Sequence, residues 1–279
     1  MNPVGSIWRK WDLHIHTPAS YHWRGKRLQD QTAVEREDTC KAIVEKMNVL
    51  DVDAFCIMDY WTFDGYLAIR EYVLLDPGIL KKQLFPGIEL RLEAPTDFRL
   101  NTHFLFDDAV PPERLQQFLS NLRMGASSGR PPSRQNFIDL GRSYDAGKLR
   151  QHSYAPEDKA DDGKMHRLGM ETAVITRESL ENAMAVVGRD SCLLIQPYDT
   201  NDGLEALDWK RQPFSDTYLM KLADIFETRS QANVDLFLGR GIPGKPHVGE
   251  EFIQNLGGRP NASSLSSPAK TVAGMSPPG

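Results

Sequence analysis

Strand-like and helix-like segments alternate over the first 124 residues of this 279-residue chain, and they alternate again after residue 168. In residues 39–50 the apolar side chains recur every three or four positions, as they do on one face of a helix. A strand–helix–strand order usually places successive strands parallel, so the pattern predicts an α/β fold with a mainly parallel sheet. The expected strands are 11–17, 53–60, 84–92, 101–107, 191–199 and 223–230, and the expected helices are 39–50, 65–75, 111–124, 177–188 and 215–222.

Two segments interrupt this regular pattern. Residues 125–168 are polar, rich in glycine and proline and without a clear period, which predicts a long insertion with one short helix at 134–144. Residues 257–279 consist mainly of Gly, Pro, Ser and Ala and offer little apolar surface to bury, so we expect this tail to be disordered. We expect one domain over residues 1–250, because α/β barrels often run past about 200 residues as a single unit.

The overall composition is that of a soluble globular protein, with 40% hydrophobic and 25% charged residues. No apolar stretch approaches the roughly 18 residues that a membrane-spanning helix needs, and no signal peptide is recognisable, so we expect no membrane partner. The three cysteines lie far apart in the sequence, which is typical of free thiols in a reducing compartment, and we expect a cytoplasmic protein. A net charge of −5 gives the chain as a whole no attraction to nucleic acid.

The first strand-like run, WDLHIHT, has a pattern that can present metal ligands. Alternate side chains of a strand share a face, so Asp12, His14 and His16 are expected on one side and the leucine and isoleucine between them on the other. Two imidazoles about 7 Å apart on one face, beside a carboxylate, can bind one metal ion or two neighbouring ions. The alternative for an isolated H-x-H is a half-exposed strand whose histidines face solvent.

The next three predicted strands each carry an acidic or histidine side chain of the type that binds metals. Asp59 ends the second strand, Glu89 alternates with apolar neighbours in the third, and His103 does so in the fourth. Barrel enzymes place their ligands in this way, near the ends of successive parallel strands. Each position alone is more often an exposed polar group or a satisfied core group, but the repetition over four strands favours a site.

These motifs together resemble the PHP (polymerase and histidinol phosphatase) superfamily. The family's first motif is H-x-H with a further histidine six residues later, which His14, His16 and His22 match. FCIMDY is similar to the second motif, T-D-H, PGIEL to the glutamate motif, and THFLF to the histidine motif that follows. The similarity covers residues 1–107 in order. More narrowly, the segment GSIWRKWDLHIHTPASY and the D-Y in place of D-H resemble the amino-terminal PHP module of TrlF-type proteins, which join such a module to an AAA-like or SMC-like ATPase.

The resemblance implies a distorted (β/α)7 barrel, incomplete at its carboxyl end in this chain, that hydrolyses phosphoesters. It implies two or three divalent transition metals (Mn, Zn or Fe), a phosphorylated small molecule or a nucleic acid as the substrate, and an ATPase domain or partner. Imidazole and carboxylate ligands suit these metals. Carried over position by position, the metal ligands are His14, His16, His22, Glu89 and His103, with Glu89 as the bridging ligand. The other candidate catalytic residues are Asp12 and Asp59, which could orient imidazoles, and Tyr60.

This sequence departs from the family pattern in two places. Tyr60 stands where the broad family has a ligand histidine, and a neutral phenol is a poor ligand, so we expect a packed aromatic side chain that could also serve as a proton donor. The late D-x-H motif is missing, since Asp12-Leu13-His14 is the only D-x-H in the chain. His152 and His166, in or beside the polar insertion, are weak substitutes for a middle ligand. Two alternatives to a phosphoesterase therefore stay open: a degenerate, non-catalytic PHP module that regulates or binds an ATPase, and a hydrolase of non-phosphate bonds like the related amidohydrolases.

Overall fold

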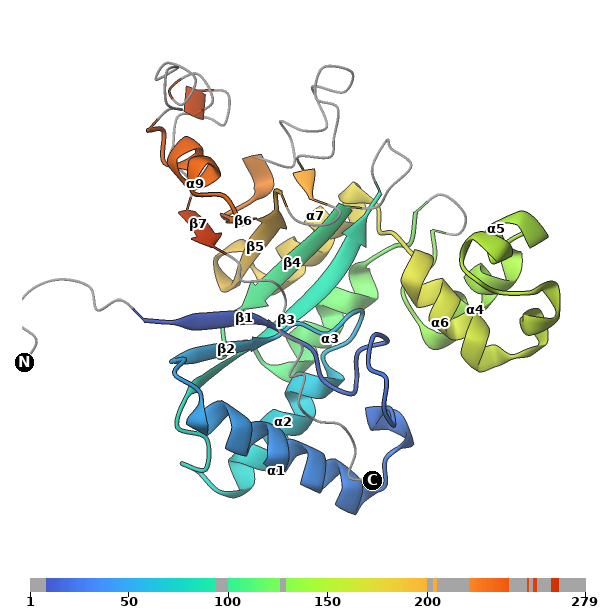
Figure 1. Cartoon of the computed structure of the whole chain (residues 1–279), viewed down its shortest axis with the longest axis horizontal. Helices are drawn as coiled ribbons and strands as arrows, with labels where there is room; N and C mark the ends of the chain where they lie inside the picture. The colour runs from blue at the N-terminus through green and yellow to red at the C-terminus, as the bar shows by residue number, and fades with distance from the viewer. Residues whose placement is uncertain are drawn as a thin grey trace, which may run out of the picture. The chain divides into compact units, whose positions relative to one another are not determined.

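A computed structural model of the chain describes residues 9–93, 100–125, 129–199, 203–204, 221–240, 250, 253–254 and 262–265. This part of the chain contains seven strands and eight α-helices, so the predicted α/β class is confirmed (Figure 1). Hydrogen bonds join the strands in their sequence order, β1 to β7. The chain divides into two compact units, which we describe separately. Of the described residues, unit 1 contains 9–88 and 105–109, and unit 2 contains the others.

Unit 1 is built on three parallel strands. These strands are β1 (Trp11–Ile15), β2 (Ala54–Ile57) and the first part of β3 (Gln83–Leu92). Ile57 of β2 lies opposite Ile15 of β1 and Pro86 of β3, and the register shifts between Asp12 and Ile15. All four residues of β2 are buried, as expected for a central parallel strand. The short run at 53–60 is therefore a core strand, as its composition predicted.

The helices of unit 1 are α1 (Ala33–Val49) and α2 (Asp64–Leu75), which Figure 1 shows on one side of β1 and β2. Helix α1 begins with a capping box: the Thr32 side chain accepts from the Glu35 backbone N–H, and the Glu35 side chain accepts from the Thr32 N–H. This cap lies before residue 39, so the helix is longer than its apolar pattern predicted. Its buried face consists of Cys40, Ile43, Val44 and Met47, which confirms the predicted spacing.

Unit 2 contains most of β4 and three further strands. The strands are β4 (Leu100–Phe106), β5 (Cys192–Pro197), β6 (Ile225–Thr228) and β7 (Ala262–Leu265), and β5, β6 and β7 pair in parallel. Helix α3 (Pro112–Asn121) packs against α7 (Arg177–Val187), and α9 (Gln231–Phe237) follows β6. The helix predicted at 215–222 lies outside the described residues except for Lys221 and Leu222.

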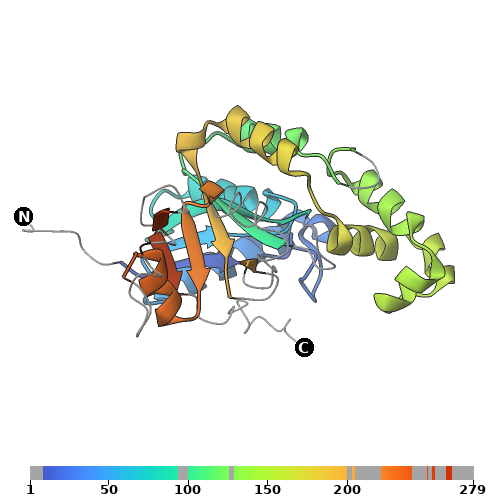
Figure 2. The ribbon, with the colours of Figure 1, turned by 90° about the horizontal axis from the view of Figure 1, so that it is seen from above.

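The structure differs from the sequence expectation within two irregular segments, although the helix predicted at 134–144 is present as α4. The insertion 125–168 contains more than one short helix: α4 (Arg134–Ser143), α5 (Ala146–Gln151) and the start of α6 (Asp162–Thr172). These helices form because sparse apolar residues, Ile138, Leu149, Met165 and Leu168, meet in a small buried cluster of their own. In Figure 2 they lie together as one yellow-green group. In the tail, where we expected disorder, residues 262–265 form β7, because pairing with β6 satisfies their backbone groups.

Helices α4 and α6 approach each other at two glycines. A Cβ atom on Gly141 would lie 2.4 Å from the Met165 carbonyl oxygen, and a Cβ on Gly169 would lie 1.9 Å from the Phe137 carbonyl oxygen. These contacts are with backbone atoms, which cannot rotate away as a side chain could. The packing of α4 against α6 therefore depends on glycine at both positions.

Replacing Gly169 with alanine is expected to lower the free energy of unfolding by about 1–3 kcal/mol, because α4 and α6 must separate to make room for the new methyl group. Gly163→Ala in the same helix is the matched control, since its Cβ would meet only the exposed Asp161 carboxylate, at 3.2 Å. Alanine there should be neutral or stabilising by up to about 1 kcal/mol through helix propensity. Urea unfolding of both variants measures the difference, and equal midpoints would contradict the packing argument.

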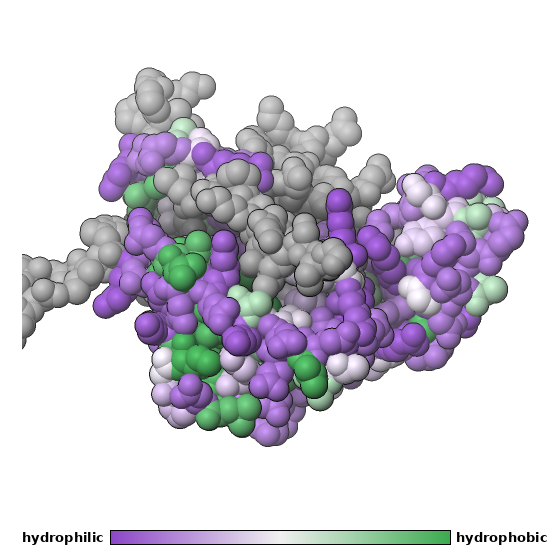
Figure 3. Space-filling model, turned by 60° about the horizontal axis from the view of Figure 1, so that its bottom comes forward, coloured by the Kyte–Doolittle hydropathy of each residue, from purple (hydrophilic) through white to green (hydrophobic). Residues whose placement is uncertain are grey.

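Large apolar side chains are exposed at a few positions of the described part of the chain. On the face that Figure 3 shows, green hydrophobic areas appear among mostly purple, hydrophilic residues. Among the described residues, the exposed large apolar side chains are those of Trp11, Val34, Val49, Leu50, Leu74, Leu75 and Leu193. Among the described helices, none has both the length and the hydropathy that a membrane crossing requires.

Candidate metal centre

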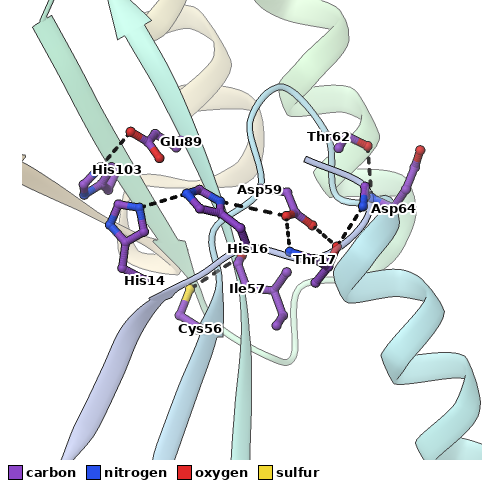
Figure 4. Close-up of polar contacts among 11 residues, drawn as sticks. His14, His16, Thr17, Cys56, Ile57, Asp59, Thr62, Asp64, Glu89 and His103 are labelled. Carbon is purple, nitrogen blue, oxygen red and sulfur yellow. Dashed lines mark hydrogen bonds and ion pairs between the residues drawn. The ribbon is translucent and has the colours of Figure 1, made fainter. Parts of the chain in front are cut away.

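The first cluster of candidate ligands is in unit 1 and starts at the end of β1. The Nε2 atoms of His14 and His16 lie 3.3 Å apart (Figure 4). Ligand atoms bound to one ion at about 2.0–2.1 Å lie roughly 3.3 Å apart in a tetrahedral site, so this spacing fits two imidazoles on a shared metal. Asp12 turns back toward its own strand, where its carboxylate accepts a long hydrogen bond of 3.4 Å from the His14 backbone N–H. The H-x-H histidines therefore converge, as the strand pattern predicted.

Asp59 anchors the chain just after these histidines. It is fully buried, and its carboxylate accepts hydrogen bonds from the Thr17 backbone N–H at 2.7 Å and from the Thr17 hydroxyl at 2.6 Å. The Nδ1 atom of His16 lies 4.0 Å from the same carboxylate, too far for a hydrogen bond. Burial raises the pKa of Asp59 to about 7, although the Thr17 hydrogen bonds act to lower it. Asp59 thus fixes the backbone between His16 and His22 more directly than it orients an imidazole.

Tyr60 is a packed aromatic side chain between two candidate ligands. It is 4% exposed, and its ring stacks on His16 with centroids 5.4 Å apart and on His22 with centroids 4.8 Å apart. Tyr21 contacts His22 and Tyr60, with ring centroids 4.2 Å and 4.8 Å away. Stacking of this kind fixes the planes of both imidazoles without a metal bond to the phenol. The position that holds a ligand histidine in the PHP family therefore supports the histidines here by packing.

The second cluster is in unit 2 and contains the other two predicted ligands. Glu89 of β3 and His103 of β4 are both buried, with the Glu89 Oε1 atom 3.4 Å from the His103 Nε2 atom. On the opposite side of the ring, the His103 Nδ1 atom lies 3.3 Å from Oε2 of Glu227 on β6. Burial acts to lower the pKa of His103, but the contacts with Glu227 and Glu89 outweigh it and raise the pKa to about 10. One imidazole is thus held between two carboxylates, of which Glu89 is buried and Glu227 is partly exposed.

Glu227 was missed in the sequence, although a signal for it was present. It lies between Phe226 and Thr228 near the end of the predicted strand 223–230, in the same alternating position that identified Glu89. The family resemblance covers only residues 1–107 and does not extend to this strand. Strand alternation alone marks Glu227 as a candidate.

A second group of polar residues, on β3, β4 and β5, lies beside this cluster and links the strands through hydrogen bonds. Two residues after Glu89, Arg91 donates to the Asn101 side chain at 3.3 Å and to the Glu171 carbonyl oxygen at 2.5 Å. Gln196 of β5 donates to the Asn101 carbonyl oxygen at 2.7 Å. Because residues two apart in a strand share a face, Glu89 and Arg91 lie on one face of β3. Neighbouring polar groups therefore fix this part of the sheet before any metal binds.

The two weaker histidine candidates lie in the helical insertion. The Nδ1 atom of His152 lies 3.1 Å from the Glu171 carboxylate, in a depression that Lys164 and Arg167 also line. The ring of His166 lies 5.9 Å from that of Phe137. These contacts of both histidines are with residues of α4 and α6.

The donor sets of both clusters fit a transition metal. His14 and His16 offer two imidazole nitrogens at a spacing suited to one ion, and Glu89 and His103 offer a carboxylate oxygen and a nitrogen at a similar spacing. Zinc, manganese and iron all accept such mixed nitrogen and oxygen ligands. The residues present can therefore hold the metals that the PHP resemblance implies.

Comparisons with known proteins give no family assignment: no protein-family model and no curated protein matches the chain. Among solved structures, an amidohydrolase from Chromobacterium violaceum, with bound sulfate and no metal, has 13% sequence identity and a TM-score of 0.43 over 91% of this chain and 88% of that chain. A candidate metal-dependent phosphoesterase from Bifidobacterium adolescentis has 14% identity and a TM-score of 0.41, over 91% and 90%. At these TM-scores the neighbours do not define an activity for this chain. Its function has to be inferred from the residues of the site.

Proposed function

We propose that this chain is a metal-dependent hydrolase that cleaves a phosphomonoester or a nucleic-acid phosphodiester. The observation that carries the proposal is the contact of Glu89 and His103, which are both buried, with Glu227 on the other side of the His103 ring. Burying ionisable groups is costly unless opposite charges compensate, so such clusters are concentrated at functional sites. Imidazole and carboxylate together are the donor set of hydrolytic metal centres.

The ligands of the proposed centre are those that the PHP resemblance implies: His14, His16, His22, Glu89 and His103. Divalent ions bound there would lower the pKa of a water molecule and neutralise charge on the phosphate oxygens. The chain's own residues would bind the ions and orient the ligand side chains. Tyr60 supports two imidazoles by stacking, and Asp59 fixes the backbone between them through Thr17. Asp12 contacts the His14 backbone, which suits a positioning role.

The finer assignments are also proposals. We propose a PHP-type barrel of the TrlF branch that acts in the cytoplasm with an ATPase domain or partner, on the basis of the sequence motifs alone. The coding sequence downstream tests this assignment. An uninterrupted frame that continues into a D-x-H motif and a Walker A loop would support it.

A non-catalytic module is the second candidate function, and the packing of Tyr60 favours it. The phenol fills a place where the PHP family has a ligand, and it is buried against the rings of His16 and His22. A site with one ligand fewer could keep a structural metal and lose turnover. In that case the chain would bind or regulate an ATPase without hydrolysing a phosphoester.

Hydrolysis of p-nitrophenyl phosphate and of its bis ester by the purified chain tests the enzyme proposal. Turnover is expected with Mn²⁺ or Zn²⁺ and should stop with a chelator. His14→Ala should lower both the amount of bound metal and the rate of hydrolysis, because one direct metal ligand is lost. We expect the rate to fall by at least about 100-fold. His166→Ala is the matched control, since that ring lies against Phe137 in the insertion, and it should change neither.

Three results separate the candidates. Metal binding that His14→Ala abolishes, without turnover on either ester, would favour the non-catalytic module. Turnover on an amide or lactone substrate alone would favour a non-phosphate hydrolase. Absence of any bound transition metal, with His14→Ala equal to the parent chain, would remove the metal proposal itself.

A further inference from the structure

His103 has a carboxylate on each side of its ring, and the two carboxylates meet different nitrogens. Glu89 lies 3.4 Å from Nε2, and Glu227 lies 3.3 Å from Nδ1. We propose that Glu227 is a positioning residue, which holds the Nδ1–H of His103 so that Nε2 binds the metal together with Glu89. This inference rests on the proposed metal centre and assigns a role in it to a residue that no PHP motif contains.

The two glutamates lie at nearly the same distance from the ring, so the nitrogen that each one meets, and not its distance, separates their roles. The ligand atoms of Glu89 and His103 belong to a group spaced for a metal ion, and Glu227 is not part of that group. Around one ion with bonds of about 2.0–2.2 Å, neighbouring ligand atoms lie roughly 3.3–3.5 Å apart, and the Glu89–His103 spacing falls in this range. The two ring nitrogens point in different directions, so one ion cannot use both. Glu227 therefore meets the nitrogen that is left over, and a ligand histidine commonly donates this second N–H to a carboxylate.

The backbone holds Glu227 rigidly at this position. Its carbonyl oxygen accepts from the Tyr198 N–H at 2.9 Å, and Glu227 pairs with Pro197 of β5 in the parallel ladder. The next residue, Thr228, donates its hydroxyl to Asp199 at 2.8 Å, which fixes the turn after β6. Pairing on both edges of β6 fixes the backbone of Glu227, so its side chain projects from a fixed point toward the His103 ring before metal binding.

A positioning residue and a direct ligand predict different losses. Removal of a carboxylate that orients a ligand histidine typically weakens metal binding by about 10–100-fold and leaves the number of bound ions unchanged. Removal of a direct ligand should reduce the number of bound ions. We therefore expect Glu227→Gln to raise the Kd for Zn²⁺ by about 10–100-fold at unchanged stoichiometry, and Glu89→Gln and His103→Ala to lower the stoichiometry.

The experiment is a competition titration of the full chain with Zn²⁺ against a chelator, with total zinc measured in parallel. Glu171→Gln is the matched control, because Glu171 also contacts a histidine, His152 at 3.1 Å, but in the helical insertion. It should leave the zinc Kd unchanged. A Kd for Glu227→Gln equal to that of the parent chain would overturn the inference, and so would the loss of one ion per chain.

A measurement on the parent chain keeps the test decisive if Glu227→Gln does not fold. Nitrogen-15 NMR of the histidine side chains in the zinc-loaded chain should show His103 with a protonated Nδ1 and a metal-bound Nε2. A metal-bound Nδ1 would overturn the inference.

Failure of the enzyme proposal alone gives a different result from failure of this inference. In that case the zinc affinity would still respond to Glu227→Gln, but no phosphoester would be cleaved. If His103→Ala leaves zinc binding intact, His103 is no ligand and both proposals fail.

Discussion

Replacing His103 with alanine is expected to destabilise the metal-free chain by about 3–5 kcal/mol at pH 7, because the change leaves two carboxylates buried without their shared cation. Glu89 is 2% and Glu227 17% exposed at the side chain, so water can solvate neither fully. In the parent chain the raised pKa of His103, about 10, keeps the ring charged between them at neutral pH. Urea unfolding in the presence of a chelator measures the loss.

The pH dependence of this loss has a definite sign. A histidine whose folded-state pKa lies above its ordinary value of 6.5 contributes stability that is fully present below pH 6.5 and disappears as the pH rises through the folded value. The parent chain should therefore lose stability between about pH 6.5 and 10. His103→Ala lacks this contribution, so the difference between the two chains should shrink over the same interval.

His152→Ala is the control for this prediction, since it removes another histidine from contact with a glutamate. The His152–Glu171 pair is more exposed, at 14% and 33%, than the His103–Glu227 pair, at 5% and 17%. Solvent screens exposed pairs, so we expect a cost nearer 1 kcal/mol or less. An equal cost for both alanine variants, or a difference from the parent that grows toward pH 10, would contradict the charged-histidine account.

The contact between Glu89 and His103 could be predicted, because alternate side chains of a strand lie on one face of the sheet. Glu89 and His103 were identified as alternating positions on neighbouring strands, and their ring and carboxylate are indeed in contact. The same rule would have found Glu227 on β6. Alternation needs only the period of a strand, so it holds even where no motif is recognised.

Features that depend on three-dimensional contact could not be predicted in the same way. The ring of Tyr60 packs against His22, which follows the strand in a loop, and no periodicity reports such packing. Gly141 falls within the helix predicted at 134–144, but nothing in the sequence indicates that Gly141 and Gly169 permit close packing of two helices. A glycine serves a loop through its backbone freedom and a helix contact through its missing side chain, and the sequence alone does not separate these roles.

Gly65 shows this second role close to the candidate ligands, and its replacement by alanine is expected to cost about 3 kcal/mol or more. A Cβ atom there would lie 2.1 Å from both the Asp59 Oδ2 and the Thr17 Oγ1 atoms, which are bonded to each other at 2.6 Å. The methyl group would have to separate this buried pair and leave the Asp59 carboxylate poorly satisfied. Because Thr17 directly follows His16, the displacement should also weaken zinc binding.

The matched control for Gly65→Ala is Gly147→Ala. Both glycines occupy the second position of a helix, Gly65 in α2 and Gly147 in α5, but a Cβ on Gly147 would meet only the exposed Asp145 carboxylate, at 3.2 Å. The control should unfold within about 1 kcal/mol of the parent chain, since alanine is the better helix former. If the Gly65→Ala chain unfolded at the same urea concentration as the control, the hydrogen bond between Asp59 and Thr17 could be broken without loss of stability. Asp59 would then not hold the backbone beside His16 in place, and its position next to the histidines would need another explanation.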